Sequence, residues 1–191
     1  MATPETFRWA TLALWTAGYG LLAGMASWTG KTAEGRPASR LVLFLKMAGL
    51  LIPLYWPWSR TGWAGGPLYP PWPGLEAGGV ALCAAGLALA VGSRLQLGPN
   101  WSESVELKER HELVVKGPYR LLRHPMYAGL DLAMAGTALV LANRMGFIIA
   151  AFAAFGTLMK ALGEEKMLAK RFPAAYPPYF KRTKRLIPFV F

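Results

Sequence analysis

The sequence predicts an all-α integral membrane protein with about five transmembrane helices. First, 54% of its 191 residues are hydrophobic and only 16% are charged, whereas about 25% of the residues of a typical soluble domain are charged. Second, the apolar residues form long blocks and do not recur at the spacing of an amphipathic helix. Third, the basic residues, which give a formal net charge of +11, fall mainly on one side of these blocks. The length fits a single domain, residues 1–191.

The first three expected spans are 7–27, 41–58 and 75–97. Segment 7–27 has 21 residues with Arg8 as its only charge, which is long enough to cross about 30 Å of hydrocarbon. It lacks a basic region before the apolar run, so we interpret it as a span and not as a cleaved signal. Segment 41–58 is interrupted by Lys46, and segment 75–97 is rich in Ala and Gly, which suits close helix packing in lipid.

The fourth and fifth expected spans are 127–142 and 145–162. Only Asn143 and Arg144 separate them, so we expect an antiparallel helical hairpin. Segment 127–142 is short and contains Asp131. An ionisable residue inside a span is costly, so Asp131 is expected either to be functional or to pair with Lys46 across helices.

The distribution of the basic residues predicts the orientation. With five spans, 17 of the 21 Lys and Arg residues lie on one side of the membrane. The positive-inside rule then places the N-terminus outside and the C-terminus in the cytoplasm. The positive charge is therefore an orientation signal, and we expect membrane lipids and not nucleic acid as partners. The basic, aromatic stretch after residue 169 is suited to an anionic membrane surface.

The expected cytoplasmic loop contains both histidines, His111 and His124. Gly117-Pro118 predicts a turn, and Pro125 suits the first turn of a helix, where its missing N–H costs nothing. His124 and Tyr127 should therefore lie at a helix N-terminus, whose unpaired N–H groups favour a carboxylate or hydroxyls of a small ligand. The alternative role for these two residues is that of anchors at the lipid headgroups.

The remaining candidates for chemistry are few. Two His and one Cys are too few ligands for a metal site, so no metal is expected. Cys83 is interpreted as a small apolar residue of the third span. Lys160 and Glu164 are one helical turn apart and form either an ion pair or part of a site.

Several motifs resemble the isoprenylcysteine carboxyl methyltransferase family, which is similar to phospholipid N-methyltransferases. They are HELV at 111–114, GPYRLLRHPMY at 117–127 and the pair Glu164-Glu165. The resemblance implies a pocket for S-adenosyl-L-methionine, formed by the cytoplasmic loop, the last two spans and the C-terminal segment within 101–188. The residues that would line it are His111, Glu112, Leu113, Val114, Tyr119, His124, Pro125, Met126, Tyr127 and Glu164.

The resemblance also indicates which residues would contact the methyl acceptor. The family usually has Arg at the position of Lys160, and Lys lacks the bidentate fork that grips a carboxylate. Lys160 and Asp131 are the expected substrate-contacting residues, and Asp131 or His124 would serve where the acceptor has to lose a proton.

The expected function is S-adenosylmethionine-dependent methyl transfer to a lipidic or small hydrophobic acceptor. Carboxyl O-methylation is the preferred interpretation. N-methylation of a phospholipid amine and S-methylation of a small thiol are alternatives on the same fold. Outside this chemistry, an NADPH-dependent membrane reductase and a non-enzymatic transporter or scaffold are the competing hypotheses. A soluble methyltransferase is excluded because no glycine-rich loop follows a strand and no strand–helix alternation exists.

Overall fold

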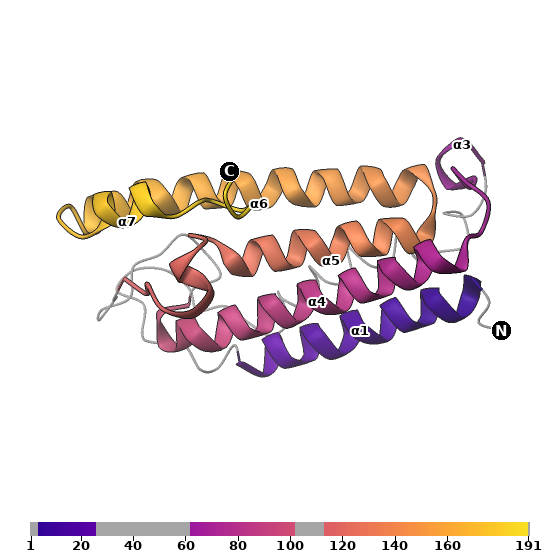
Figure 1. Cartoon of the computed structure of the whole chain (residues 1–191), viewed down its shortest axis with the longest axis horizontal. Coiled ribbons are helices and arrows are strands. Elements are labelled where there is room, and N and C mark those ends of the chain that lie inside the picture. The colour runs from indigo at the N-terminus through magenta and orange to yellow at the C-terminus, as the bar shows by residue number, and fades with distance from the viewer. Residues whose placement is uncertain (1–3, 26–61, 102–112, 191) are drawn as a thin grey trace.

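The computed structural model describes residues 4–25, 62–101 and 113–190. Within these ranges, four long helices lie side by side in the order α1, α4, α5, α6 (Figure 1). They are α1 (Pro4–Gly24), α4 (Pro73–Leu97), α5 (Pro125–Leu141) and α6 (Arg144–Arg171). The short elements are α3 (Gly62–Gly65), the 3-10 turns η3 (Gly98–Asn100) and η4 (Gly117–Arg120), and α7 (Tyr176–Arg182).

The helix directions bring the candidate site to one end of the layer. Helices α1, α4 and α6 run the same way, and α5 runs back between α4 and α6 (Figure 1). The C-terminal ends of α4 and α6, the N-terminal end of α5 and the whole of α7 therefore gather at one end. At the other end lie α3 and the turn between α5 and α6.

The predicted helical hairpin is confirmed. Helix α5 ends at Leu141, Ala142 adopts a left-handed conformation, and the Asn143 side chain caps α6 by accepting a hydrogen bond of 2.8 Å from the N–H of Gly146. Such an N-cap satisfies one of the free N–H groups of the first turn. Helix α5 begins at Pro125, as its position after His124 predicts.

The spans agree in part with the sequence interpretation. Among the described residues, two helices are long and apolar enough to cross a membrane, Pro73–Asn100 and Arg144–Arg171, and Pro125–Leu141 is a shorter apolar helix. The helix that contains the expected span 145–162 continues to Arg171, because Glu, Lys, Met, Leu and Ala after residue 162 favour a helix. The expected span 41–58 lies outside the described residues.

Helices α4 and α5 pack through their backbones. A Cβ atom added to Gly86 would lie 2.5 Å from the backbone nitrogen of Ala133 and 2.5 Å from the carbonyl oxygen of Gly129. Farther along, a Cβ on Gly136 would lie 2.5 Å from the carbonyl oxygen of Gly79. The two helices can be this close only because glycine has no side chain at these points. This contact accounts for the Ala- and Gly-rich composition of the third block.

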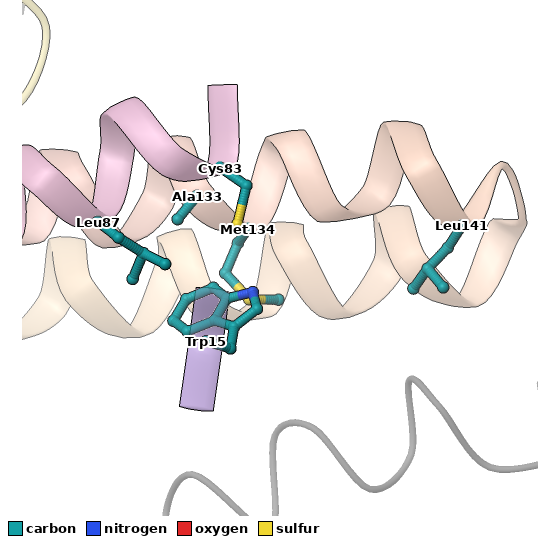
Figure 2. Close-up of a cluster of buried hydrophobic side chains, with 6 residues drawn as sticks. All are labelled: Trp15, Cys83, Leu87, Ala133, Met134 and Leu141. Carbon is teal, nitrogen blue, oxygen red and sulfur yellow. The ribbon is translucent and has the colours of Figure 1, made fainter. Parts of the chain in front are cut away.

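The hydrophobic core joins α1 to the α4–α5 pair. Figure 2 shows the cluster, in which Trp15 of α1 lies beside Met134 of α5. The Trp15 indole donates a 2.8 Å hydrogen bond to the hydroxyl of Thr137. Cys83 is fully buried in the same cluster, as expected for a small apolar residue of this span.

Candidate functional site

The segment after α6 folds back onto the segment before α5. The N–H of Arg123 donates to the carbonyl of Lys184 (2.7 Å), and the N–H of Lys184 donates to the carbonyl of Leu121 (3.0 Å). The N–H of His124 donates to the carbonyl of Arg185 (3.1 Å). This short parallel pairing places the side chains of residues 123–124 and 185 beside the C-terminal part of α6.

Glu165 of α6 is the central carboxylate. It is buried, yet Arg123 donates to it through Nε at 2.7 Å and Arg185 donates through Nη2 at 2.8 Å. His124 Nε2 lies 3.5 Å from Glu165 Oε1. Two guanidinium groups on one buried carboxylate offset the cost of removing its charge from water. Glu165 thus ties the loop, α6 and the C-terminal segment together.

Glu164 joins the same group from the neighbouring position. The Tyr127 hydroxyl donates to Glu164 Oε1 at 2.5 Å, and His124 Nδ1 lies 3.4 Å from Glu164 Oε2. The rings of His124 and Tyr127 are stacked, with centroids 5.6 Å apart, and Lys160 Nζ lies 5.3 Å from the Tyr127 ring centroid. We call Arg123, His124, Tyr127, Glu164 and Glu165 the site cluster.

His124 stands between the two carboxylates. Burial alone lowers the pKa of its imidazole, but hydrogen bonds and charge interactions with Glu164 and Glu165 raise it more, so the net pKa lies above 6.5. Only the imidazolium has an N–H on both ring nitrogens, and each nitrogen here faces a carboxylate oxygen. The geometry therefore favours the charged form of His124.

The surroundings of the site cluster are aromatic. Met126 and Tyr127 are buried in one group with Trp101, and Tyr119 is buried in η4, where the Tyr179 hydroxyl donates to its carbonyl at 2.9 Å. Burial raises the pKa of the Tyr119 phenol well above 10, so this group stays protonated. Among the described residues, the atoms of this region that are buried without a hydrogen-bond partner include the Trp101 indole N–H, Nε2 of His124 and the hydroxyl of Tyr176.

The structure brings most of the predicted site residues to one place. His124, Tyr127 and Glu164 are in direct contact, and Pro125, Met126 and Tyr119 are buried next to them. Leu113 and Val114 are half-buried in irregular backbone, whereas His111 and Glu112 lie outside the described residues.

The two expected substrate residues lie between α5 and α6. Asp131 accepts hydrogen bonds from the hydroxyl of Thr157, at 2.8 and 3.0 Å to its two oxygens. Its proposed alternative partner, Lys46, lies outside the described residues. Lys160 is one turn of α6 farther on and contacts the ring of Tyr127.

The sequence reasoning missed Arg123, Arg185 and Glu165 as a connected group. Two features of the sequence point to this group. Glu165 is the second acid of the Glu164-Glu165 pair and is the one that pairs with the guanidinium groups, and Arg123 directly precedes His124. Neither signal identifies Arg185 as the third member, because it belongs to a separate segment.

Comparisons with known proteins match this region of the chain. A family model described as phospholipid methyltransferase matches residues 76–175. Protein-S-isoprenylcysteine O-methyltransferase B of Arabidopsis thaliana is 31% identical over 87 residues, which are 45% of this chain and 44% of that protein. A probable protein-S-isoprenylcysteine O-methyltransferase of Oryza sativa subsp. japonica is 28% identical over 87 residues, covering 45% of this chain and 46% of that protein. The matches thus span less than half the length of these curated relatives.

Proposed function

The chain belongs to the phospholipid methyltransferase family, and we propose that it is a membrane enzyme that methylates a lipidic or small hydrophobic acceptor. The family uses S-adenosylmethionine as methyl donor. The matched residues 76–175 include nearly all of α4, the whole of α5 and α6, and the whole site cluster. The family favours methyl transfer over the competing NADPH-dependent reductase.

The observation that carries this proposal is the contact between the two motifs. The Tyr127 hydroxyl of the first motif donates to Glu164 of the second, 37 residues away in the sequence. His124 lies beside both residues. A partly exposed carboxylate, a charged imidazole and a phenol at a helix N-terminus form a group suited to a small polar ligand.

The residues present fit S-adenosylmethionine, which has an ammonium, a carboxylate, ribose hydroxyls and an adenine ring. Glu164 is the more accessible acid of the pair and can accept from the ammonium or the hydroxyls. The Lys160 ammonium offers an opposite charge to a carboxylate. The buried N–H of Trp101 and hydroxyl of Tyr176 have no hydrogen-bond partner among the described residues, and a polar ligand could provide one.

The protein's part in methyl transfer is to hold the reacting atoms in line and to exclude water. When bound, S-adenosylmethionine supplies an electrophilic methyl group on a sulfonium. Glu165, with Arg123 and Arg185, keeps His124 and the C-terminal segment in place around the site. The aromatic groups around the cluster reduce the access of water.

For the acceptor, we prefer a carboxylate, because both relatives named above are O-methyltransferases and Lys160 provides a positive charge at the α5–α6 interface. A carboxylate needs no base. An amine or thiol acceptor remains the alternative, for which Asp131 or His124 would take the proton. In this proposal the N-terminus is outside and the site faces the cytoplasm, following the excess of basic residues at that end.

Binding of labelled S-adenosylmethionine to the purified full chain tests the proposal. We expect His124→Ala and Glu164→Ala each to weaken binding by roughly tenfold or more, the effect of losing a hydrogen bond to a charged group. Glu5→Ala is the matched control, since it removes a half-exposed carboxylate from α1 at the other end of the molecule. Unchanged binding in both site variants would refute the proposal. Recovery of the label in a lipid, protein or volatile fraction then identifies the acceptor class.

A further inference from the structure

The outward face of α6 carries a continuous apolar stripe. Ile148, Phe152, Phe155 and Met159 are all exposed, with Phe152 at 74% and Phe155 at 61%. They follow one another at spacings of three or four residues, so they lie on a single face of the helix. Ile149, Ala150 and Ala153, which pack against the hydrophobic core, lie on the opposite face of α6, and Figure 1 shows α6 at the edge of the layer. In a membrane, such a stripe faces acyl chains.

The same face becomes basic where the apolar stripe ends. Gly163, Lys166 and Lys170 follow Met159 at the same spacing of three or four residues, so they lie on the same face of α6. A groove of about 440 Å³ opens here, and the described residues that line it are Gly163, Lys166, Met167, Lys170 and Arg171. Three of these five residues are cations, and all three are exposed.

The three cations have no partner in the described part of the chain. No carboxylate there lies within 4 Å of Lys166, Lys170 or Arg171, whereas Arg123 and Arg185 are both paired with Glu165. Three like charges at neighbouring positions of one helix repel each other. An anion in the groove would remove this repulsion.

The groove is separate from the site cluster. Ala161 and Glu165 are buried and mark the inward face of α6, which faces α5 and the C-terminal segment. The sequence positions place Lys166 and Lys170 with the exposed stripe and not with this inward face. Changes in the groove therefore leave the residues proposed to bind the methyl donor intact.

From this arrangement we propose that an anionic phospholipid binds along the outer face of α6. Its phosphate lies among Lys166, Lys170 and Arg171, and its acyl chains lie along Met159, Phe155 and Phe152. A free phosphate or an acidic peptide would use only the basic groove. The apolar stripe leading into the groove matches a ligand that has an anionic head and long apolar chains. This lipid is a bound component of the protein and distinct from the methyl acceptor.

The test compares the full-length protein in detergent micelles with two triple variants. Lys166→Gln/Lys170→Gln/Arg171→Gln removes the groove charges, and Lys181→Gln/Arg182→Gln/Lys184→Gln removes three charges from the same end of the molecule. Binding of dioleoylphosphatidylglycerol and dioleoylphosphatidylcholine is counted by native mass spectrometry. Thermal unfolding followed by circular dichroism measures the stabilisation that each lipid provides.

We expect the wild type and the control variant to prefer phosphatidylglycerol, and the groove variant to lose roughly tenfold or more in affinity for it. Lys166→Arg/Lys170→Arg should keep the preference, which shows that folding tolerates changes here. Phe152→Ser/Phe155→Ser should weaken lipid binding with the groove charges intact. Equal losses in the groove and control variants would overturn the proposal, because they indicate only general attraction to anionic micelles. Stabilisation by glycerol 1-phosphate equal to that by the lipid would also overturn it.

Discussion

Replacing Gly86 with alanine tests the close approach of α4 and α5. In the present structure the new Cβ would lie 2.5 Å from backbone atoms of Gly129 and Ala133, whereas an ordinary contact begins at 3.4 Å. Because both obstacles are backbone, neither can rotate away, and the helices have to move apart by roughly 0.9 Å. A gap of this size forfeits about a quarter to a half of the dispersion energy of the contacts it opens.

The expected cost combines two opposing effects. Alanine favours a helix interior over glycine by about 1 kcal/mol. Overpacking costs about 1–3 kcal/mol, and the gap spreads along the interface that α4 and α5 share. Gly92 lies in the same helix, and a Cβ atom added to it would have nothing within 4 Å. Gly92→Ala should therefore gain the helix propensity of alanine without the cost of overpacking. We therefore expect Gly86→Ala to be less stable than Gly92→Ala by ~2 kcal/mol.

The assay is thermal or denaturant unfolding of both variants in the same detergent, followed by far-UV circular dichroism. Gly129→Ala should behave like Gly86→Ala, because its Cβ would meet the Gly86 carbonyl at 2.5 Å. The double variant should cost less than the sum of the two, since one separation of the helices relieves both clashes. The reasoning is refuted if Gly86→Ala unfolds at the same temperature as Gly92→Ala or above it.

Two further predictions concern the site cluster. Arg185→Ala removes one of the two guanidinium groups that bind Glu165. We therefore expect the C-terminal segment to be held less tightly, and trypsin to cleave between α6 and residue 185 faster than in the wild type. An unchanged cleavage rate would contradict the role of this ion pair. Because the pKa of His124 is raised in the folded protein, its stabilising contribution is complete below about pH 6.5 and is lost as the pH rises through the folded value. As the pH is raised above 6.5, the unfolding temperature of the wild type should therefore decrease, whereas that of His124→Gln should change less. Identical pH profiles of the two proteins would contradict the charge assigned to the imidazole.

The helices were predictable where one physical cause dominates. The apolar blocks predict α4 and the α5–α6 hairpin, because no other arrangement hides so many consecutive apolar residues. Pro125 predicts the start of α5, since proline is tolerated only in the first turn. The end of α6 was not predictable from apolar content, because the residues after 162 are polar but still favour a helix.

The candidate site was predictable in its residues but not in its connections. The resemblance to the methyltransferase family implies a common pocket for His124, Tyr127 and Glu164. The partners of Glu165 and Asp131 depend instead on which segments meet in space. Thr157, the partner of Asp131, gives no signal of its own, because a threonine in an apolar helix commonly bonds its own backbone, and the carbonyl oxygen of Ala154 also lies within 2.9 Å of the Thr157 hydroxyl.

The two ion pairs of Glu165, with Arg123 and Arg185, have a consequence for biosynthesis. A chain emerges from the ribosome in sequence order, at about 5–20 residues per second. Arg123 and Glu165 are therefore synthesised before Arg185. Until then Glu165 lacks one of its two guanidinium partners. The pairing of Glu165 with Arg185 is thus the last of these contacts that the order of synthesis permits, and it forms only after α6 and α7 have been made.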